Sequence, residues 1–161
     1  MDTVERRAAR VLLIADGAVL LIQGHDPSQP ELGPWWHTPG GGIEEGEALE
    51  TAAAREVEEE TGLHVDVESL GPCIATRRTT FAFDGRSYEQ DEWFFALRVD
   101  RFEPHGRGWI EIEQRSLLRY GWWTPDELDA TSEIVYPAEL GTVVRALLAG
   151  PIVEPRRLSG D

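Results

Sequence analysis

Carboxylates crowd one short segment of the chain, because residues 44–60 contain eight glutamates and only one basic residue. The apolar residues of this segment repeat with the period of an α-helix from about Glu47 to Thr61. On that helix Glu56 and Glu60 lie within about 40° of the centre of the apolar stripe, at about 100° per residue, and Glu59 flanks them. Carboxylates gathered on an inward face repel one another and lose solvation, so they need a cation to balance them.

The types of ligand indicate which cation this would be. Carboxylate oxygens with no Cys or His nearby suit Mg²⁺ or Mn²⁺, ions that proteins often share with the phosphates of a substrate. Arg55 lies one turn before Glu59 and can form an ion pair with it. Glycines 40–42 let the backbone approach the helix and offer a carbonyl ligand or room for a phosphate. The simpler alternative is a solvated, salt-bridged helix, which the inward position of Glu56 and Glu60 disfavours.

The rest of the chain must hold this helix, and its pattern predicts a mixed α/β fold. Two hairpins are expected where apolar runs are joined by Asp-Gly turns. The first covers residues 6–23, and the second pairs a strand over 65–83 with one over 87–99. A further strand-like stretch lies at residues 109–113.

The C-terminal third is expected to add two helices. Thr124-Pro125-Asp126-Glu127 combines an N-cap, a Pro at the first helical position and a Glu at N3, so a short helix should begin there. An amphipathic helix over 137–149 should then close the core. We therefore expect one domain over 1–161, with a core at about 6–150 and a frayed tail at 151–161.

Composition narrows the classes of protein further. The 161 residues suit a single core, and the one cysteine, Cys73, excludes a disulfide framework and favours a reducing, cytoplasmic location. The formal net charge of −15 makes duplex nucleic acid and anionic membranes poor partners. The apolar run after the first arginines is too short for a secretion signal or a membrane span.

The acidic segment resembles a known sequence box. It has Gly41, five residues, Glu47, seven residues and then the run Arg55-Glu56-Val57-x-Glu59-Glu60-x-Gly62-Leu63, which matches every specified position of the box of the Nudix hydrolases. Trp-x-x-Pro-Gly-Gly before it and Trp-Trp-x-Pro-x-Glu-Leu after it are also similar to that family. The resemblance implies an α/β/α sandwich with a mixed sheet. It also implies an Mg²⁺- or Mn²⁺-dependent hydrolase that cleaves a nucleoside diphosphate linked to another moiety.

The resemblance also implies roles for individual residues. The metal ligands would be three side chains and one main-chain carbonyl: Glu56, Glu59, Glu60, and Gly40 or Gly41. Three further residues would support them, Arg55 by orienting the acids, Glu47 by bracing the loop–helix–loop, and Gly62 by allowing the turn into the next strand. The partner would be a small-molecule nucleotide, and a homodimer is compatible with the family.

Residues outside the box supply the remaining candidates. For a general base the first candidate is Glu113 and the second is Glu111, because they lie one strand period apart and face the same side. Both are equally well read as exposed acids. Arg77 and Arg78 are candidates for contacting a substrate phosphate or ribose, and the alternative is that they are exposed strand cations. Of the neighbouring Trp side chains, Trp122 is the candidate for stacking on a base, although core packing is the simpler interpretation.

Two other readings stay open beside catalysis. The same fold could serve as a non-catalytic module that senses a nucleotide, although the box is undegraded and no second domain is evident. Isopentenyl diphosphate isomerases share the fold and use a cysteine, but nothing around Cys73 supports a reactive thiol. His37 lies close to the glycines and could touch a substrate, or could be a structural histidine. The family's subclass signals are missing, so the sequence does not name the leaving group.

Overall fold

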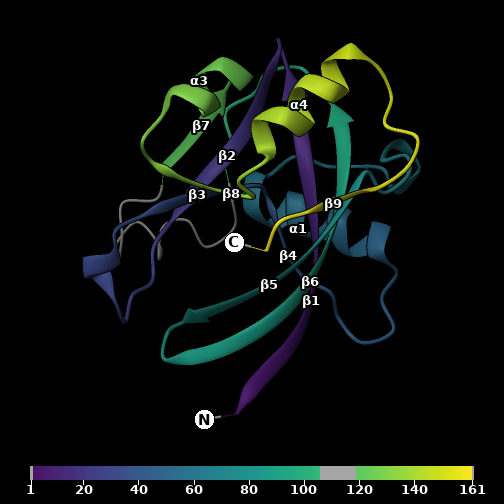
Figure 1. Ribbon diagram of the computed structural model, residues 1–161. Helices are drawn as coiled ribbons and strands as arrows, with labels where there is room; N and C mark the ends of the chain where they lie inside the picture. The colour runs from purple at the N-terminus through teal and green to yellow at the C-terminus, as the bar shows by residue number, and fades with distance from the viewer. Residues whose placement is uncertain (1, 106–118, 161) are drawn as a thin grey trace.

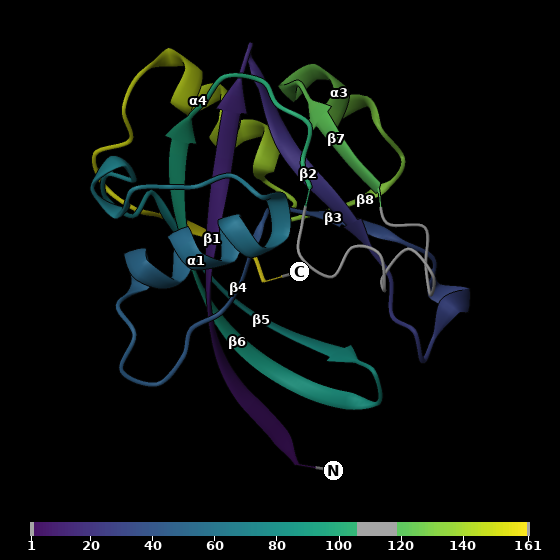
Figure 2. The ribbon, with the colours of Figure 1, turned by 180° about the vertical axis from the view of Figure 1, so that it is seen from behind.

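The computed structural model describes residues 2–105 and 119–160. Its strands are β1 (Thr3–Ala15), β2 (Ala18–Gly24), β3 (Trp35–His37), β4 (Gly40–Gly42), β5 (Ala75–Phe83), β6 (Arg86–Arg98), β7 (Arg119–Trp123), β8 (Ile134–Tyr136) and β9 (Arg156–Leu158). Its helices are α1 (Leu49–Thr61), α3 (Pro125–Ala130) and α4 (Leu140–Ala149), with 3-10 turns at Pro30–Leu32 and Val67–Ser69. Figures 1 and 2 show these elements from opposite sides.

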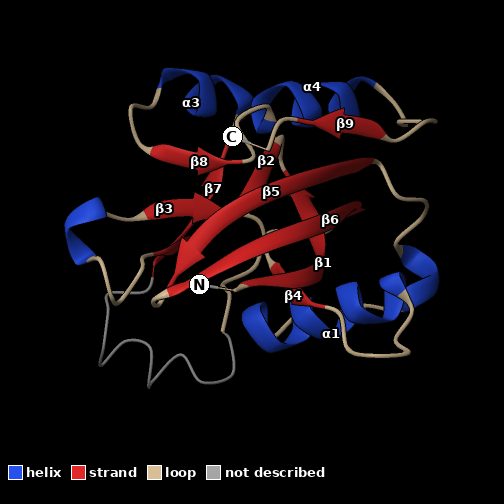
Figure 3. Cartoon of the chain, turned by 60° about the horizontal axis from the view of Figure 1, so that its bottom comes forward, coloured by secondary structure: helices blue, strands red, loops and turns tan. Residues whose placement is uncertain are grey.

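The described strands form one mixed sheet with helices on both faces. Its order is β8-β3-β2-β1-β6-β5-β9, and β4 and β7 add to β1 and β2. The long strands β1 and β6 run parallel at the centre, while β5 and β6 form an antiparallel hairpin. Helix α1 lies on one face and α3 and α4 on the other (Figure 3). The expected α/β fold with a mixed sheet is therefore confirmed.

Successive side chains of β1 alternate between the two faces of the sheet and belong to two separate hydrophobic clusters. Ala9, Val11 and Leu13 pack toward α1, whereas Leu12 and Ile14 pack toward α4. Successive side chains of a strand point to opposite faces, so one strand can fill both layers. The position of Arg10 on the same side as Leu12 and Ile14 therefore places a charge at the edge of an apolar layer.

Local turn and cap signals give the expected structures. Asp16 and Gly17 both have positive φ, as do Asp84 and Gly85, which is the backbone of the predicted tight hairpin turns. At the start of α3 the Thr124 side chain accepts a hydrogen bond from the main-chain N–H of Glu127, and the Glu127 carboxylate accepts one from the N–H of Thr124. The capping box is therefore confirmed.

Helix α1 begins at Leu49, two residues later than predicted, because Glu45 and Gly46 form a turn before it, closed by a hydrogen bond from the Glu47 N–H to the Glu44 carbonyl. It ends at Gly62, whose φ of 79° is the left-handed cap expected from the sequence. A Cβ at this position would also lie 2.6 Å from the carbonyl oxygen of His105, so the close approach of that segment requires glycine as well.

Two predicted elements are shorter than expected. The strand over 65–83 is formed only at Ala75–Phe83, because a 3-10 turn and Gly71, with a φ of 68°, interrupt the backbone before it. The closing helix begins at Leu140 rather than 137, after the short strand β8. The predicted strand at 109–113 lies outside the described residues.

The prediction of a frayed tail at 151–161 is wrong. Arg156–Leu158 forms β9, which pairs in parallel with β5, and Leu158 is buried against the core. The next residues are also held, because the Ser159 N–H donates to Glu139 Oε2 at 2.6 Å and the Gly160 carbonyl accepts from Thr79 Oγ1 at 2.7 Å. The C-terminal segment is therefore the last strand of the sheet.

Candidate functional site

Arg55 lies in the middle of α1 and is the centre of an ion-pair cluster. Its Nε and Nη2 donate to the two carboxylate oxygens of Glu47, each at 2.9 Å, which is the bidentate geometry of a strong charged pair. Nη2 also donates to the Gly42 carbonyl at 3.0 Å, and Nη1 donates to Glu56 Oε1 at 2.9 Å. The predicted ion pair with Glu59 is present at 3.4 Å. Arg55 thus ties the glycine segment to the acids of the helix.

The pKa values of this cluster follow from the geometry. The hydrogen bonds from Arg55 lower the pKa of Glu47 to about 2. Burial raises the pKa of Glu56 even though Arg55 and Arg10 counteract it. Burial raises the pKa of Glu60 much further, to about 8, and the nearby Glu56 charge adds to that increase. The carboxylates of one helix face therefore differ in how much a nearby positive charge would stabilise their ionised forms.

The burial of the three acids agrees with their predicted positions on the helix. The Glu56 side chain is 14% exposed, whereas Glu59 is 40% exposed and flanks the stripe. Glu60 is the acid with the least satisfied carboxylate, because its Oε2 atom is buried and has no hydrogen-bond partner. A buried carboxylate oxygen without a partner costs free energy and marks a place where a cation would be stabilised.

The glycine segment lies directly on these acids. The main-chain N–H of Gly40 hydrogen-bonds to the Glu60 carboxylate. A Cβ at Gly41 would lie 2.5 Å from Glu56 Oε2, so a larger residue there would displace this carboxylate. Gly40 has a φ of 148° and could not carry a side chain either, because a Cβ there would overlap β1. The structure therefore brings the main chain of Gly40 and Gly41 and the side chains of Glu56 and Glu60 into one region.

These groups fit a hard divalent cation. They are carboxylate and carbonyl oxygens, the ligand types that Mg²⁺ and Mn²⁺ prefer, and one of the carboxylate oxygens is buried without a partner. In the described part of the chain, no three His, Cys, Asp or Glu side chains are already gathered into an ion site. Among the described residues such a group is absent because the carboxylates of Glu47, Glu56 and Glu59 all form ion pairs with Arg55.

A second charged cluster, which the sequence did not indicate, lies across the sheet beside the glycines. Glu92 is its centre and is buried. Its carboxylate accepts from Arg77 Nη1 at 2.7 Å, from Gln90 Nε2 at 2.9 Å and from Arg10 Nε at 3.3 Å. These hydrogen bonds and charges lower the pKa of Glu92 in spite of its burial. We call Arg10, Arg77, Gln90 and Glu92 the sheet cluster.

Some signal for the sheet cluster exists in the sequence. Arg10 interrupts the alternating apolar face of β1, and a charge at such a position needs a buried partner. The pairing of Arg77 with Glu92 depends on the register of β5 against β6, in which the two residues are directly opposite. The predicted Asp84-Gly85 turn sets this register, so the facing of Arg77 and Glu92 could have been derived from the sequence, whereas their burial could not.

The predicted substrate cations have protein partners in this structure. Arg77 is not an exposed strand cation, because it is buried, its Nε donates to the Ser159 carbonyl at 2.8 Å and its guanidinium lies over the Tyr136 ring. Arg78 is exposed and forms ion pairs within 3.4 Å with three acids, Glu5, Glu89 and Asp91. Contact of either arginine with a substrate stays a prediction.

Trp122 and Trp123 are neighbours in β7, and their side chains point to opposite faces of the sheet, as alternation along a strand requires. Trp36 and Trp123 belong to the α4 side of the core and meet edge to face at 5.2 Å between ring centroids. Trp122 packs on the α1 side, 5.7 Å from the Phe102 ring and beneath the Arg101 guanidinium. Its role in binding a base stays a prediction beside this packing role.

The remaining candidates are structural or lie outside the described residues. His37 Nδ1 contacts the Thr38 carbonyl at 2.9 Å, and burial lowers its pKa to about 4, so its ring is neutral near pH 7. Burial raises the pKa of Cys73, which agrees with an unreactive thiol. Both general-base candidates, Glu113 and Glu111, fall in 106–118 and lie outside the described residues.

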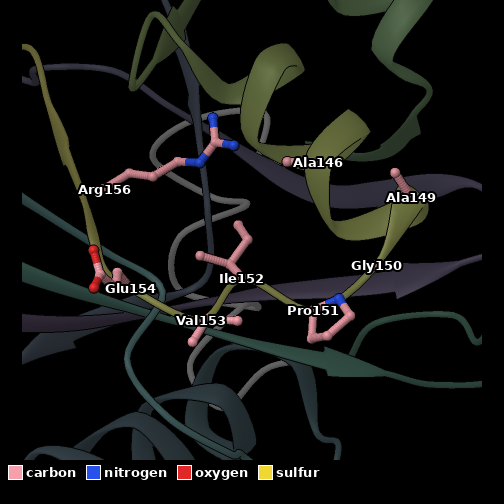
Figure 4. A pocket seen from close by; sticks show the side chains of 8 residues that line it. All are labelled: Ala146, Ala149, Gly150, Pro151, Ile152, Val153, Glu154 and Arg156. Atoms are coloured by element: carbon pink, nitrogen blue, oxygen red, sulfur yellow. The ribbon is translucent and has the colours of Figure 1, made fainter.

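A groove of about 480 Å³ lies away from the box, between the C-terminal end of α4 and β9 (Figure 4). It is lined mainly by the backbone and the aliphatic side chains of residues 146–156, and its charged lining residues are Glu154 and Arg156. It holds none of the box acids, so it is not the candidate site. None of the described helices is both long enough and apolar enough to cross a membrane.

Comparison with protein families gives one match. The family model described as NUDIX domain matches residues 4–141. These residues include the ion pairs of Arg55, the sheet cluster and helix α1. Among curated proteins, an RNA pyrophosphohydrolase of Caulobacter vibrioides is 31% identical over 157 residues, covering 86% of this chain and 80% of that protein. A MutT-like protein of Streptomyces ambofaciens is 32% identical over 133 residues, covering 82% of this chain and 71% of that protein.

Solved structures agree on the fold. An ADP-ribose pyrophosphatase from Streptococcus suis superposes with a TM-score of 0.62 at 18% identity, covering 94% of this chain and 98% of that one. At this level of identity the similarity concerns the arrangement of the sheet and helices. It agrees with the sandwich expected from the box.

Proposed function

Because the chain belongs to the NUDIX family and is a hydrolase of that family, we propose that it is a pyrophosphohydrolase dependent on Mg²⁺ or Mn²⁺ that cleaves a phosphoanhydride bond in a nucleotide substrate. The observation that carries the proposal is the buried, unpartnered Oε2 of Glu60 beside the Gly40 main chain. It is supported by the match of the family model and by the relatives named above.

Four groups would hold the cation. They are the carboxylates of Glu56, Glu59 and Glu60 and a main-chain carbonyl at Gly40 or Gly41. When bound, the cation supplies positive charge that offsets the negative charge on the phosphate oxygens during hydrolysis.

The chain's own residues prepare this site. Arg55 positions Glu56 and Glu59 by donating to their carboxylates, and Glu47 fixes Arg55 through its bidentate pair. Glu113, or Glu111 in its place, would accept the proton of the water that attacks phosphorus while the second phosphate group leaves. Arg77, Arg78 and Trp122 are the proposed substrate contacts.

The substrate is proposed as a small nucleotide or the 5′ end of an RNA. The relative from Caulobacter, named an RNA pyrophosphohydrolase, supports the RNA end. The net charge of −15 disfavours long contacts with a nucleic-acid backbone, which favours recognition of a terminal triphosphate over that of a duplex. The non-catalytic reading stays an outcome of the test below.

The test compares wild type with Glu60→Gln, a substitution that keeps the shape of the side chain and removes its charge. Phosphate or pyrophosphate release is measured with Mg²⁺ and with Mn²⁺ on nucleoside triphosphates, ADP-ribose and a 5′-triphosphate RNA. We expect at least one substrate to be turned over and kcat to fall on the order of a thousandfold in the variant. Equal turnover in both proteins would contradict the metal assignment. Nucleotide binding without turnover on any substrate would favour the sensing module.

A further inference from the structure

Arg10 lies against the glycine segment on the side opposite Arg55. Its Nη1 donates to the Gly40 carbonyl at 3.2 Å and to the Thr38 carbonyl at 3.3 Å, so it spans the turn at Pro39. A Cβ at Gly40 would lie 2.7 Å from Arg10 Cδ, which shows how closely the side chain follows the glycine backbone. Arg10 therefore fixes the direction of one of the two carbonyls that are candidates for the cation.

The charge of Arg10 also acts on the acids of the box. It favours the ionised form of Glu60, and to a smaller degree that of Glu56. Gly40 connects the two groups directly, because its N–H hydrogen-bonds to Glu60 and its carbonyl accepts from Arg10. One peptide segment is thus held between a carboxylate and a guanidinium.

The sheet cluster keeps Arg10 in this place. Glu92 accepts from Arg10 Nε with the oxygen that also accepts from Gln90, and its other oxygen accepts from Arg77. The Arg10 side chain is only 17% exposed, so water does little to screen its charge. A guanidinium held on both sides has a fixed position relative to the box.

We propose that Arg10 is a positioning residue that acts as the built-in counter-cation of the candidate metal site. It holds the Gly40 carbonyl when no divalent cation is bound, and it competes with that cation for this oxygen. This inference rests on the proposed function, because it takes the box acids and the Gly40 carbonyl as the metal ligands.

The sign of the effect follows from charge. A positive group a few ångströms from a divalent cation weakens its binding, so neutralising Arg10 should strengthen it. For Arg10→Gln we expect the Kd for Mn²⁺ to fall about tenfold relative to wild type. Arg10→Lys keeps the charge but has one donor nitrogen, so it cannot contact Glu92 and the two carbonyls at once as the Nε and Nη1 atoms of Arg10 do, and its Kd should lie between the two.

The experiment titrates Mn²⁺ into the full chain, stripped beforehand with a chelator, and measures heat of binding without substrate. Arg145→Gln is the matched control, because it removes the same charge from an exposed position of α4, where Arg145 pairs with Asp126 and Asp129 of α3. Its Kd should equal that of wild type. Glu60→Gln, measured in parallel, identifies the binding that belongs to the box.

The outcomes separate the two proposals. No Mn²⁺ binding in wild type, or binding that Glu60→Gln leaves unchanged, would overturn the proposed metal site itself. Binding lost in Glu60→Gln but unchanged or weakened in Arg10→Gln would overturn the role of Arg10 alone. If Arg10→Gln does not fold, Arg10→Lys decides, since a Kd equal to wild type would contradict competition at the Gly40 carbonyl.

Discussion

Two clusters of ion pairs meet at the glycine segment, and they are built in different ways. The Arg55 cluster joins residues within one loop and one helix, and its arginine side chain is 25% exposed. The sheet cluster joins β1, β5 and β6, and Arg77 and Glu92 are only 6% and 5% exposed. Buried pairs tolerate no missing partner, whereas partly exposed pairs can rearrange. We therefore expect the sheet cluster to maintain the fold and the Arg55 cluster to reorganise during function.

The largest test of this difference is Glu92→Ala, which leaves the buried guanidinium of Arg77 without its carboxylate. We expect the free energy of unfolding to fall by about 3 to 5 kcal/mol, measured by denaturant titration. The control is the double variant Arg77→Met with Glu92→Met, which removes both charges and should lose much less. A loss under about 1 kcal/mol in Glu92→Ala would mean that the cluster is not a structural unit.

Glu60→Gln tests whether the box site is strained without a cation. Burial raises the pKa of Glu60 to about 8 from an ordinary 4.5, so the folded chain keeps a proton that the unfolded chain releases. The stability from this group is full below about pH 4.5 and is lost as pH rises through about 8. In chelator we expect the variant to be more stable than wild type by roughly 4 kcal/mol near pH 8, and equal to it near pH 4. If the free energies of unfolding of wild type and the variant changed with pH in the same way, the burial of this carboxylate would be contradicted.

Glu47→Gln tests the Arg55 cluster and should show the opposite pH dependence. Arg55 lowers the pKa of Glu47 to about 2, so the stabilisation is present above about pH 4.5 and is lost as pH falls through about 2. We expect thermal unfolding near pH 7 to show a loss of about 1 kcal/mol, which disappears in acid. An equal loss at every pH would indicate packing rather than charge.

Arg78→Gln should have the smallest effect. Its three acidic partners are exposed, and solvent screens such pairs, so they contribute little to stability. The small difference from wild type should vanish in high salt when unfolding curves are compared. A loss that exceeds that of Glu47→Gln would contradict the ranking of these exposed pairs below the Arg55 cluster.

The sequence could predict the parts of the fold that depend on neighbouring residues. The hairpin turns at Asp16 and Asp84, the capping box at Thr124 and the cap at Gly62 are signalled by two to four adjacent residues, and the structure has all of them. The box acids could be placed on one face for the same reason, since a helix has a fixed period.

Long-range pairing could not be predicted in this way. Arg10 and Glu92 are 82 positions apart, and only the parallel register of β1 against β6 brings them close. Strand β9 has three residues, two of them arginine, so it carries no alternating pattern, and it was expected to be frayed. Its place is set by β5 and by hydrogen bonds to residues near it in space, which no local signal reveals.

The parallel pairing of β1 with β6 also sets an order for biosynthesis. A nascent chain exposes the first strand and Arg10 long before Glu92 has been translated. Until then the β1 edge and the unpaired guanidinium remain in water, and the central sheet cannot close. Folding should therefore start late, after the second hairpin leaves the ribosome, and shorter nascent chains would depend on chaperones to cover the open strand edge.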